Sequence, residues 1–151
     1  MRRWWARALG VAAVGVLIVG LVAAGDPVVT RGRLERSLTP TFTALYLQQA
    51  SILGHPGLSA SGLGARSSCD RGGPKVADVG PGSDWICFID WTDVAGKHQH
   101  GKFELQAKAN ACYVATGPSR INGPVMLTDR RTGRDVLNPV FEFDACYDPT
   151  G

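Results

Sequence analysis

The longest apolar stretch of the chain lies near its beginning. Residues 8–25 carry no charged side chain and consist mainly of Ala, Val, Leu, Ile and Gly. As a helix, such a segment reaches roughly 27 Å, close to the thickness of about 30 Å of the hydrocarbon core of a bilayer. The pattern therefore predicts either a transmembrane anchor or the apolar part of a signal peptide.

The charges around this segment predict its orientation. Residues 1–7 contain three arginines, and no lysine or arginine follows the segment until Arg31. Because positive residues stay on the cytoplasmic side, we expect residues 1–7 inside and the rest of the chain outside. The small residues at 22–25 also suit a signal peptidase, so retention and cleavage of residues 1–25 both stay open. We expect a single-pass protein of the cell membrane or a secreted protein.

A second apolar pattern, with helical spacing, follows a polar segment at 26–37 that we interpret as a stalk. Thr39 and Pro40 suit the start of a helix, and Gly54 suits the position just after its end. The apolar positions between them form one stripe, which is typical of a face packed on a core. They are Leu38, Phe42, Leu45, Tyr46, Ile52 and Leu53.

After this helix the pattern changes to that of strands. Residues 58–68 are rich in Gly, Ala and Ser and predict a loop, and residues 69–83 are interrupted by prolines and glycines. From Trp85 to Trp91 apolar residues alternate, which predicts a strand. We expect further strands at 103–107, 112–115, 125–127 and 136–143, with a hairpin loop at 93–101. A short strand at 76–79 is a further candidate.

These elements predict an α+β domain over residues 38–148. After the N-terminal apolar helix, one amphipathic helix would pack on a curved antiparallel sheet of four to five strands, which buries both apolar faces.

Four cysteines favour disulfides in this domain: Cys69, Cys87, Cys112 and Cys146. An even number of cysteines outside the cytoplasm usually forms bridges, and four cysteines allow three pairings. We favour the neighbour pairing, Cys69 with Cys87 and Cys112 with Cys146. A zinc site is the alternative, but no pair has the C-x-x-C spacing.

Charge excludes one class of function. The chain has 16 basic and 13 acidic residues, and its excess is accounted for by the three arginines within residues 1–7. The domain itself is neutral, so the sequence gives no support for nucleic-acid binding.

Catalytic motifs are missing from the sequence. His98 and His100 are two residues apart and could reach one metal ion in an extended segment, with His55 as a third ligand. They stand in no metalloenzyme signature, and no nucleophile elbow is present. We therefore predict no cofactor, with His98 and His100 as the candidate residues if a metal does bind.

The aromatic residues of the strand at 85–91 give the best indication of binding. Phe88 points to the face opposite Trp85 and Trp91, because side chains alternate along a strand. An aromatic residue on the outer face would form a binding surface for a ligand or protein, whereas burial of all three would make them core residues.

Two stretches resemble a known type of protein: residues 73–91 (GPKVADVGPGSDWICFIDW) and residues 110–113 (NACY). They resemble the uncharacterised small membrane-anchored or secreted proteins of high-GC Gram-positive bacteria. The resemblance implies an envelope location and supplies no catalytic residues.

The sequence thus predicts an extracytoplasmic, non-enzymatic envelope protein that binds a partner or ligand and contacts the membrane through its N-terminal segment. The alternatives are a small secreted enzyme, with a metal at His98 and His100, and an accessory subunit of a membrane assembly.

Overall fold

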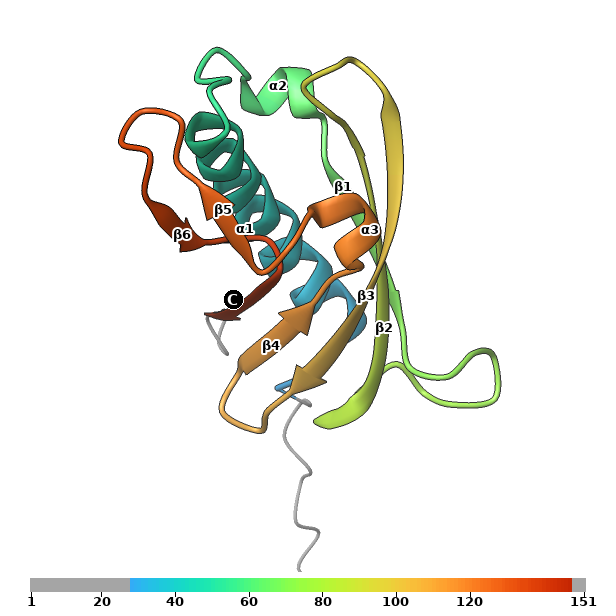
Figure 1. Ribbon diagram of the computed structural model, residues 1–151. Coiled ribbons are helices and arrows are strands. Elements are labelled where there is room, and N and C mark those ends of the chain that lie inside the picture. The colour runs from blue at the N-terminus through green and yellow to red at the C-terminus, as the bar shows by residue number, and fades with distance from the viewer. Residues whose placement is uncertain (1–27, 148–151) are drawn as a thin grey trace, which may run out of the picture.

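The computed structural model describes residues 28–147, which form a long helix lying across a curved antiparallel sheet (Figure 1). The α+β class and the antiparallel sheet that the sequence predicts are therefore confirmed. The anchor or signal predicted at 8–25 lies outside the described residues. Within residues 28–147, no helix combines the length and the apolar character that crossing a bilayer requires.

The helix α1, Arg31–Ile52, begins well before the predicted start. Thr30 is its N-cap, and the Thr30 side chain accepts a hydrogen bond from the backbone of Arg33. Residues 31–37, the larger part of the stalk predicted at 26–37, are thus the first turns of a packed helix, whereas residues 26 and 27 lie outside the described residues. Pro40 lies inside α1 on its exposed side, where water can replace the hydrogen bond that proline cannot donate.

Two short helices and seven strands follow α1 in the described part of the chain. They are α2 Ala60–Leu63, β1 Arg66–Asp70, β2 Gly82–Thr92, β3 His98–Ala107, β4 Cys112–Thr116, α3 Ser119–Asn122, β5 Met126–Thr128, β6 Asp135–Leu137 and β7 Glu142–Cys146. The main sheet has the order β1-β2-β3-β4-β7, and β5 pairs with β6 in a separate hairpin. All of these pairings are antiparallel. The sheet therefore has two edge strands, β1 and β7.

Three strand predictions were wrong. β1 lies where the sequence predicts loop, because its small polar residues carry no alternating apolar signal. Residues 76–79 form no strand beyond one isolated bridge from Val79 to Thr30. The strand predicted at 136–143 is divided into β6 and β7, with Pro139 in the turn between them.

The core lies between α1 and the inner face of the sheet. The alternation from Trp85 to Trp91 places four side chains of β2 inward, as predicted. Phe42 of α1 packs on Trp91 and Phe103, with ring centroids 4.9 and 5.5 Å apart. This aromatic cluster fixes the helix on the sheet.

One disulfide joins each edge strand to its neighbour. Cys69 of β1 bonds to Cys87 of β2, and Cys112 of β4 bonds to Cys146 of β7. The neighbour pairing is thus confirmed, and the bridged cysteines leave no thiolates for the alternative zinc site. The first disulfide is buried on the inner face, whereas Cys146 is exposed on the outer face.

Candidate functional site

The predicted binding surface is divided between the two faces of β2. Trp85 and Trp91 are 0% and 1% exposed, so they belong to the core. Phe88 lies on the outer face, half-buried, and stacks on the His100 ring with the centroids 4.9 Å apart. Phe88 and His100 therefore form an aromatic pair that solvent can reach.

The two candidate metal ligands lie on β3 rather than in the predicted hairpin loop. Nδ1 of His100 donates a hydrogen bond to Asp90 at 2.7 Å. Nε2 of His98 lies 3.9 Å from the same carboxylate. His55 follows the end of α1. Within residues 28–147, no three His, Cys, Asp or Glu side chains are arranged as metal ligands.

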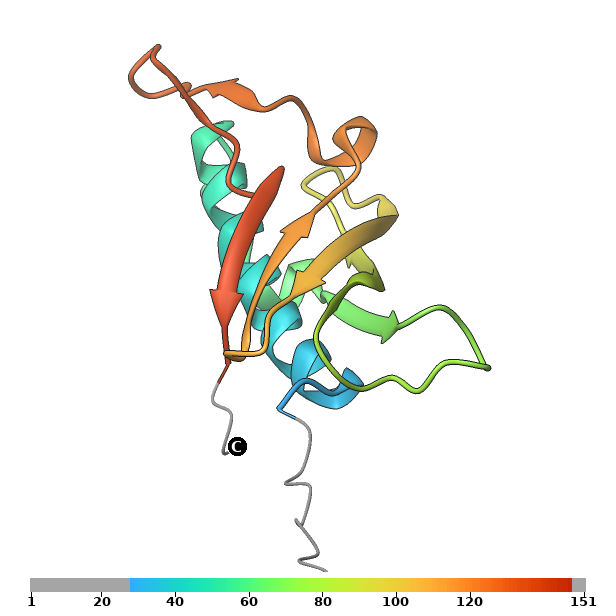
Figure 2. The same cartoon turned by 90° about the horizontal axis from the view of Figure 1, so that it is seen from below.

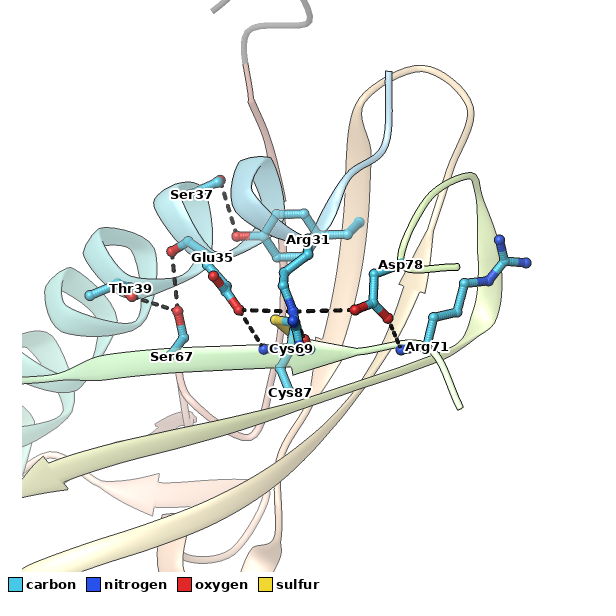
Figure 3. Close-up of a disulfide and its surroundings, with 10 residues drawn as sticks. Arg31, Glu35, Ser37, Thr39, Ser67, Cys69, Arg71, Asp78 and Cys87 are labelled. Atoms are coloured by element: carbon cyan, nitrogen blue, oxygen red, sulfur yellow. Dashed lines mark hydrogen bonds and ion pairs between the residues drawn. A yellow bond between two sulfur atoms is a disulfide. The ribbon is translucent and has the colours of Figure 1, made fainter. Parts of the chain in front are cut away.

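The edge of the sheet at β1 is closed by side chains of α1 (Figure 3). The backbone N–H of Cys69 donates to the Glu35 carboxylate at 2.8 Å, and Nε of Arg31 donates to the Cys69 carbonyl at 2.5 Å. The Ser67 hydroxyl donates to the backbone carbonyl of Glu35 and also contacts the Thr39 hydroxyl at 2.6 Å. The two bonds to Cys69 satisfy backbone groups that an edge strand otherwise leaves free, and the Ser67 contacts hold β1 against α1.

Ion pairs hold the loop between β1 and β2 against this closed edge. Arg31 lies 3.4 Å from the Asp78 carboxylate, which also accepts a hydrogen bond from the backbone of Arg71. The Arg71 guanidinium binds Asp84 at 2.9 Å and thereby lowers the pKa of the Asp84 carboxyl below its ordinary value. Because these charges are paired within the domain, we interpret the network as structural.

The opposite edge, at β7, is open. The Gly117 amide donates to the Phe141 carbonyl and the Tyr147 amide donates to the Ala111 carbonyl, so alternate residues of this segment pair with β4. The backbone groups of the residues between them point away from β4. We call these outward groups the open edge: they belong to Glu142, Asp144 and Cys146, all exposed. No hydrogen-bond partner for them exists among residues 28–147.

Exposed apolar side chains gather on the β5–β6 hairpin, close to the beginning of β7. Val125 and Met126 are each 46% exposed and Leu137 is 71% exposed. We call these three residues the hairpin patch. A pocket of about 220 Å³ opens between Val125, Leu137, Phe141 and Glu142. Large apolar side chains in contact with water are unfavourable unless another surface covers them.

Buried amides hold this hairpin in place. The Gln49 side chain of α1 donates to the Asn122 carbonyl at 2.6 Å and to the Asn138 side chain at 3.0 Å. Asn138 donates in turn to the Asn122 and Pro124 carbonyls. These hydrogen bonds therefore fix the position of the hairpin that carries the patch.

β7 lies beside β4 at the end of the sheet (Figure 2). Its residues Glu142 and Asp144 carry carboxylates beside the open edge. Glu142 accepts a hydrogen bond from the Thr116 hydroxyl at 3.2 Å, while Asp144 has no ion-pair partner within residues 28–147. A shallow groove of about 370 Å³ runs along both carboxylates, past the exposed disulfide, to Lys108. This combination of open backbone groups, apolar pocket and negative charge suits an extended polypeptide.

For the strand at 136–143, Pro139 predicts an edge or a bulge, and β7 does lie at an edge of the sheet. The hairpin patch was not predicted, because the alternation of apolar residues places Leu137 in a strand and does not record its exposure. Which backbone groups of β7 stay open depends on pairing between distant strands. Comparison with protein-family models, curated proteins and solved structures finds no significant match to the chain.

Proposed function

We propose that this is an envelope protein whose domain lies outside the cytoplasm and binds a protein partner without catalysing a reaction. The two disulfides indicate an extracellular or secreted location, because such bonds persist in oxidising compartments. The anchor or signal segment at 8–25, with its N-terminus inside, is part of the proposal. The role of accessory subunit in a membrane assembly is a special case of it.

One observation supports partner binding most strongly: the open edge and the hairpin patch are adjacent. Val125 and Leu137 of the patch share a pocket with Glu142, the first residue of β7. Exposed backbone groups at a sheet edge are a template for pairing with another chain, and an exposed apolar patch marks an interaction surface. Here the open edge of β7 lies beside an apolar patch on a hairpin that buried amides hold in place. A protein partner covers both at once.

Phe88 provides a second, separate surface on the outer face of the sheet. Its stacking on His100 leaves part of the ring in water. Phe88 is the alternative contact surface for the partner or for a ligand.

Photo-crosslinking in intact cells of the native host tests the proposal and distinguishes these surfaces. A photo-reactive amino acid is placed at position 137, at position 88 and, as a control, at the exposed position 61 on α2. We expect one defined protein adduct from position 137 and none from position 61. An adduct from position 88 alone would move the binding surface to the outer face. No protein adduct from 137 or 88 would refute partner binding.

A further inference from the structure

The two edges of the sheet differ in a way that identifies how a partner can bind. At β1, side chains of α1 occupy the backbone N–H and C=O of Cys69, which blocks strand addition at this residue. At β7, the outward N–H and C=O groups of alternate residues remain available. An extended chain that pairs with them continues the antiparallel ladder, as in recognition by strand addition.

We propose that β7 accepts an extended segment of a partner protein as an added strand of the sheet. This inference rests on the proposed function and specifies the contact. The added strand forms backbone hydrogen bonds with Glu142, Asp144 and Cys146. At one end, an apolar side chain of the segment enters the pocket between Val125 and Leu137.

The charges on β7 specify the side chains of this segment. Glu142 and Asp144 are two residues apart and project from the same face. In an added strand, the residues directly across from Glu142 and Asp144 project from that face as well. Positive side chains at these positions would be attracted to the two carboxylates. The segment therefore carries basic residues at two alternate positions.

The same charges argue against a second copy of this chain as the occupant. A two-fold antiparallel pairing centred on Phe143 brings Asp144 opposite Glu142 of the other copy, and one centred on Asp144 brings the two Asp144 residues opposite each other. Like charges at directly opposed positions are destabilising. The carboxylates thus protect the edge from self-association and leave it available to a basic segment.

Synthetic peptides provide the probe. The full-length chain in detergent micelles is mixed with a seven-residue peptide of alternating Lys and Val, with its Glu/Val counterpart, or with an N-methylated Lys/Val peptide that cannot donate. We expect the Lys/Val peptide alone to slow the exchange of the Glu142, Asp144 and Cys146 amides, by roughly tenfold at saturation. If the Lys/Val peptide slows the exchange of other amides instead, or of no amides, the proposal is overturned.

Charge reversal tests the specificity. With Asp144→Lys, we expect binding of the Lys/Val peptide to weaken by roughly three- to tenfold and binding of the Glu/Val peptide to improve. Glu104→Lys, an exposed carboxyl on the central strand β3, is the matched control and should change neither affinity by as much. Equal effects of the two variants would show general charge attraction and overturn the inference.

Asp144→Pro separates strand addition from the proposed function. The Asp144 amide points outward, so proline there removes an open-edge donor without removing a hydrogen bond to β4. We expect it to abolish both peptide protection and the adduct from position 137. An unchanged adduct would mean that a partner binds without adding a strand, so only the strand addition fails. If the variant does not fold, the charge-reversal pair decides.

A second copy of the chain as the occupant gives a different result. Slower exchange of the same amides without any peptide, increasing with protein concentration, would identify a second copy and overturn the proposal.

Discussion

The backbone N–H of Cys69 donates a hydrogen bond of 2.8 Å to the carboxylate of Glu35. This bond links an edge strand to the helix that crosses it, at the residue that also carries the buried disulfide. Together with the bond from Arg31 to the Cys69 carbonyl, it closes β1 against additional strands. Of the two edges of the five-stranded sheet, β7 is therefore the one that is left available for strand addition.

Glu35→Ala should open this edge. The Cys69 amide would lose its acceptor, and we expect the free energy of unfolding to fall by about 1–3 kcal/mol. Urea denaturation measures this loss, and light scattering measures the increased self-association of the exposed edge. Glu35→Gln retains an acceptor and should lose less. Equal losses for the two variants would contradict the assigned role.

The two disulfides should differ in their reaction with thiols. Cys146 is exposed, whereas Cys69 and Cys87 are 1% and 0% exposed. Because exchange requires a thiolate to reach a sulfur atom, we expect Cys112–Cys146 to be reduced first. Timed reduction, alkylation and peptide mass measurement give the order. Simultaneous appearance of all four thiols would mean that reduction follows global unfolding instead.

Gln49 should determine the position of the hairpin patch. Gln49→Leu leaves the Asn138 side-chain oxygen and the Asn122 carbonyl without this donor, and we expect a loss of about 1–3 kcal/mol. We also expect faster proteolysis in the β5–β6 hairpin. The neighbouring Gln48 is exposed, so Gln48→Leu is the matched control. A stable hairpin in Gln49→Leu would disprove the supporting role of the network.

Alkaline pH should destabilise the domain through its tyrosines. Burial raises the pKa of Tyr113 above the ordinary value of 10.0, with the opposing hydrogen bond from Ser37 as a smaller effect. Burial likewise raises the pKa of Tyr46 and Tyr147. A group whose pKa is higher in the folded state than in the unfolded state stabilises the fold fully below its unfolded-state pKa. This contribution is lost as the pH rises through its folded-state pKa.

We therefore expect the free energy of unfolding to fall above about pH 10. Tyr113→Phe should flatten this fall, although it loses the hydrogen bond at neutral pH. Urea denaturation at neutral pH and at about pH 11 provides the comparison. An unchanged alkaline slope in Tyr113→Phe would show that this hydroxyl does not titrate as a buried group.

The sequence predicts the buried half of the fold well. Alternation from Trp85 to Trp91 identifies β2 and its inner face, and the even number of cysteines identifies two disulfides. These signals are local, or arise from composition, so the chain displays them directly. The outward position of Phe88 follows from the same alternation.

Other features depend on contacts that no local pattern records. The start of α1 was misplaced because Thr39 and Pro40 resemble a helix start, whereas the observed start depends on Thr30 and on Arg31 contacts with β1. β1 itself is stabilised by pairing and by Glu35 rather than by strand propensity. The open edge exists only because β7 is the last strand in the sheet order.

The disulfides also limit how far the domain can be stretched. The Tyr147 hydroxyl donates to the Val28 carbonyl at 3.2 Å, so both ends of the described chain lie at one end of the molecule. When these ends are pulled apart, the two disulfides keep the segments between the bonded cysteines, with sequence separations of 18 and 34 residues, from being extended. At about 3.3–3.6 Å per extended residue, they remove roughly 180 Å of possible extension. A domain held between a tether and a bound partner would therefore bear mechanical load as a short, strong link, and reduction would convert it into a much longer one.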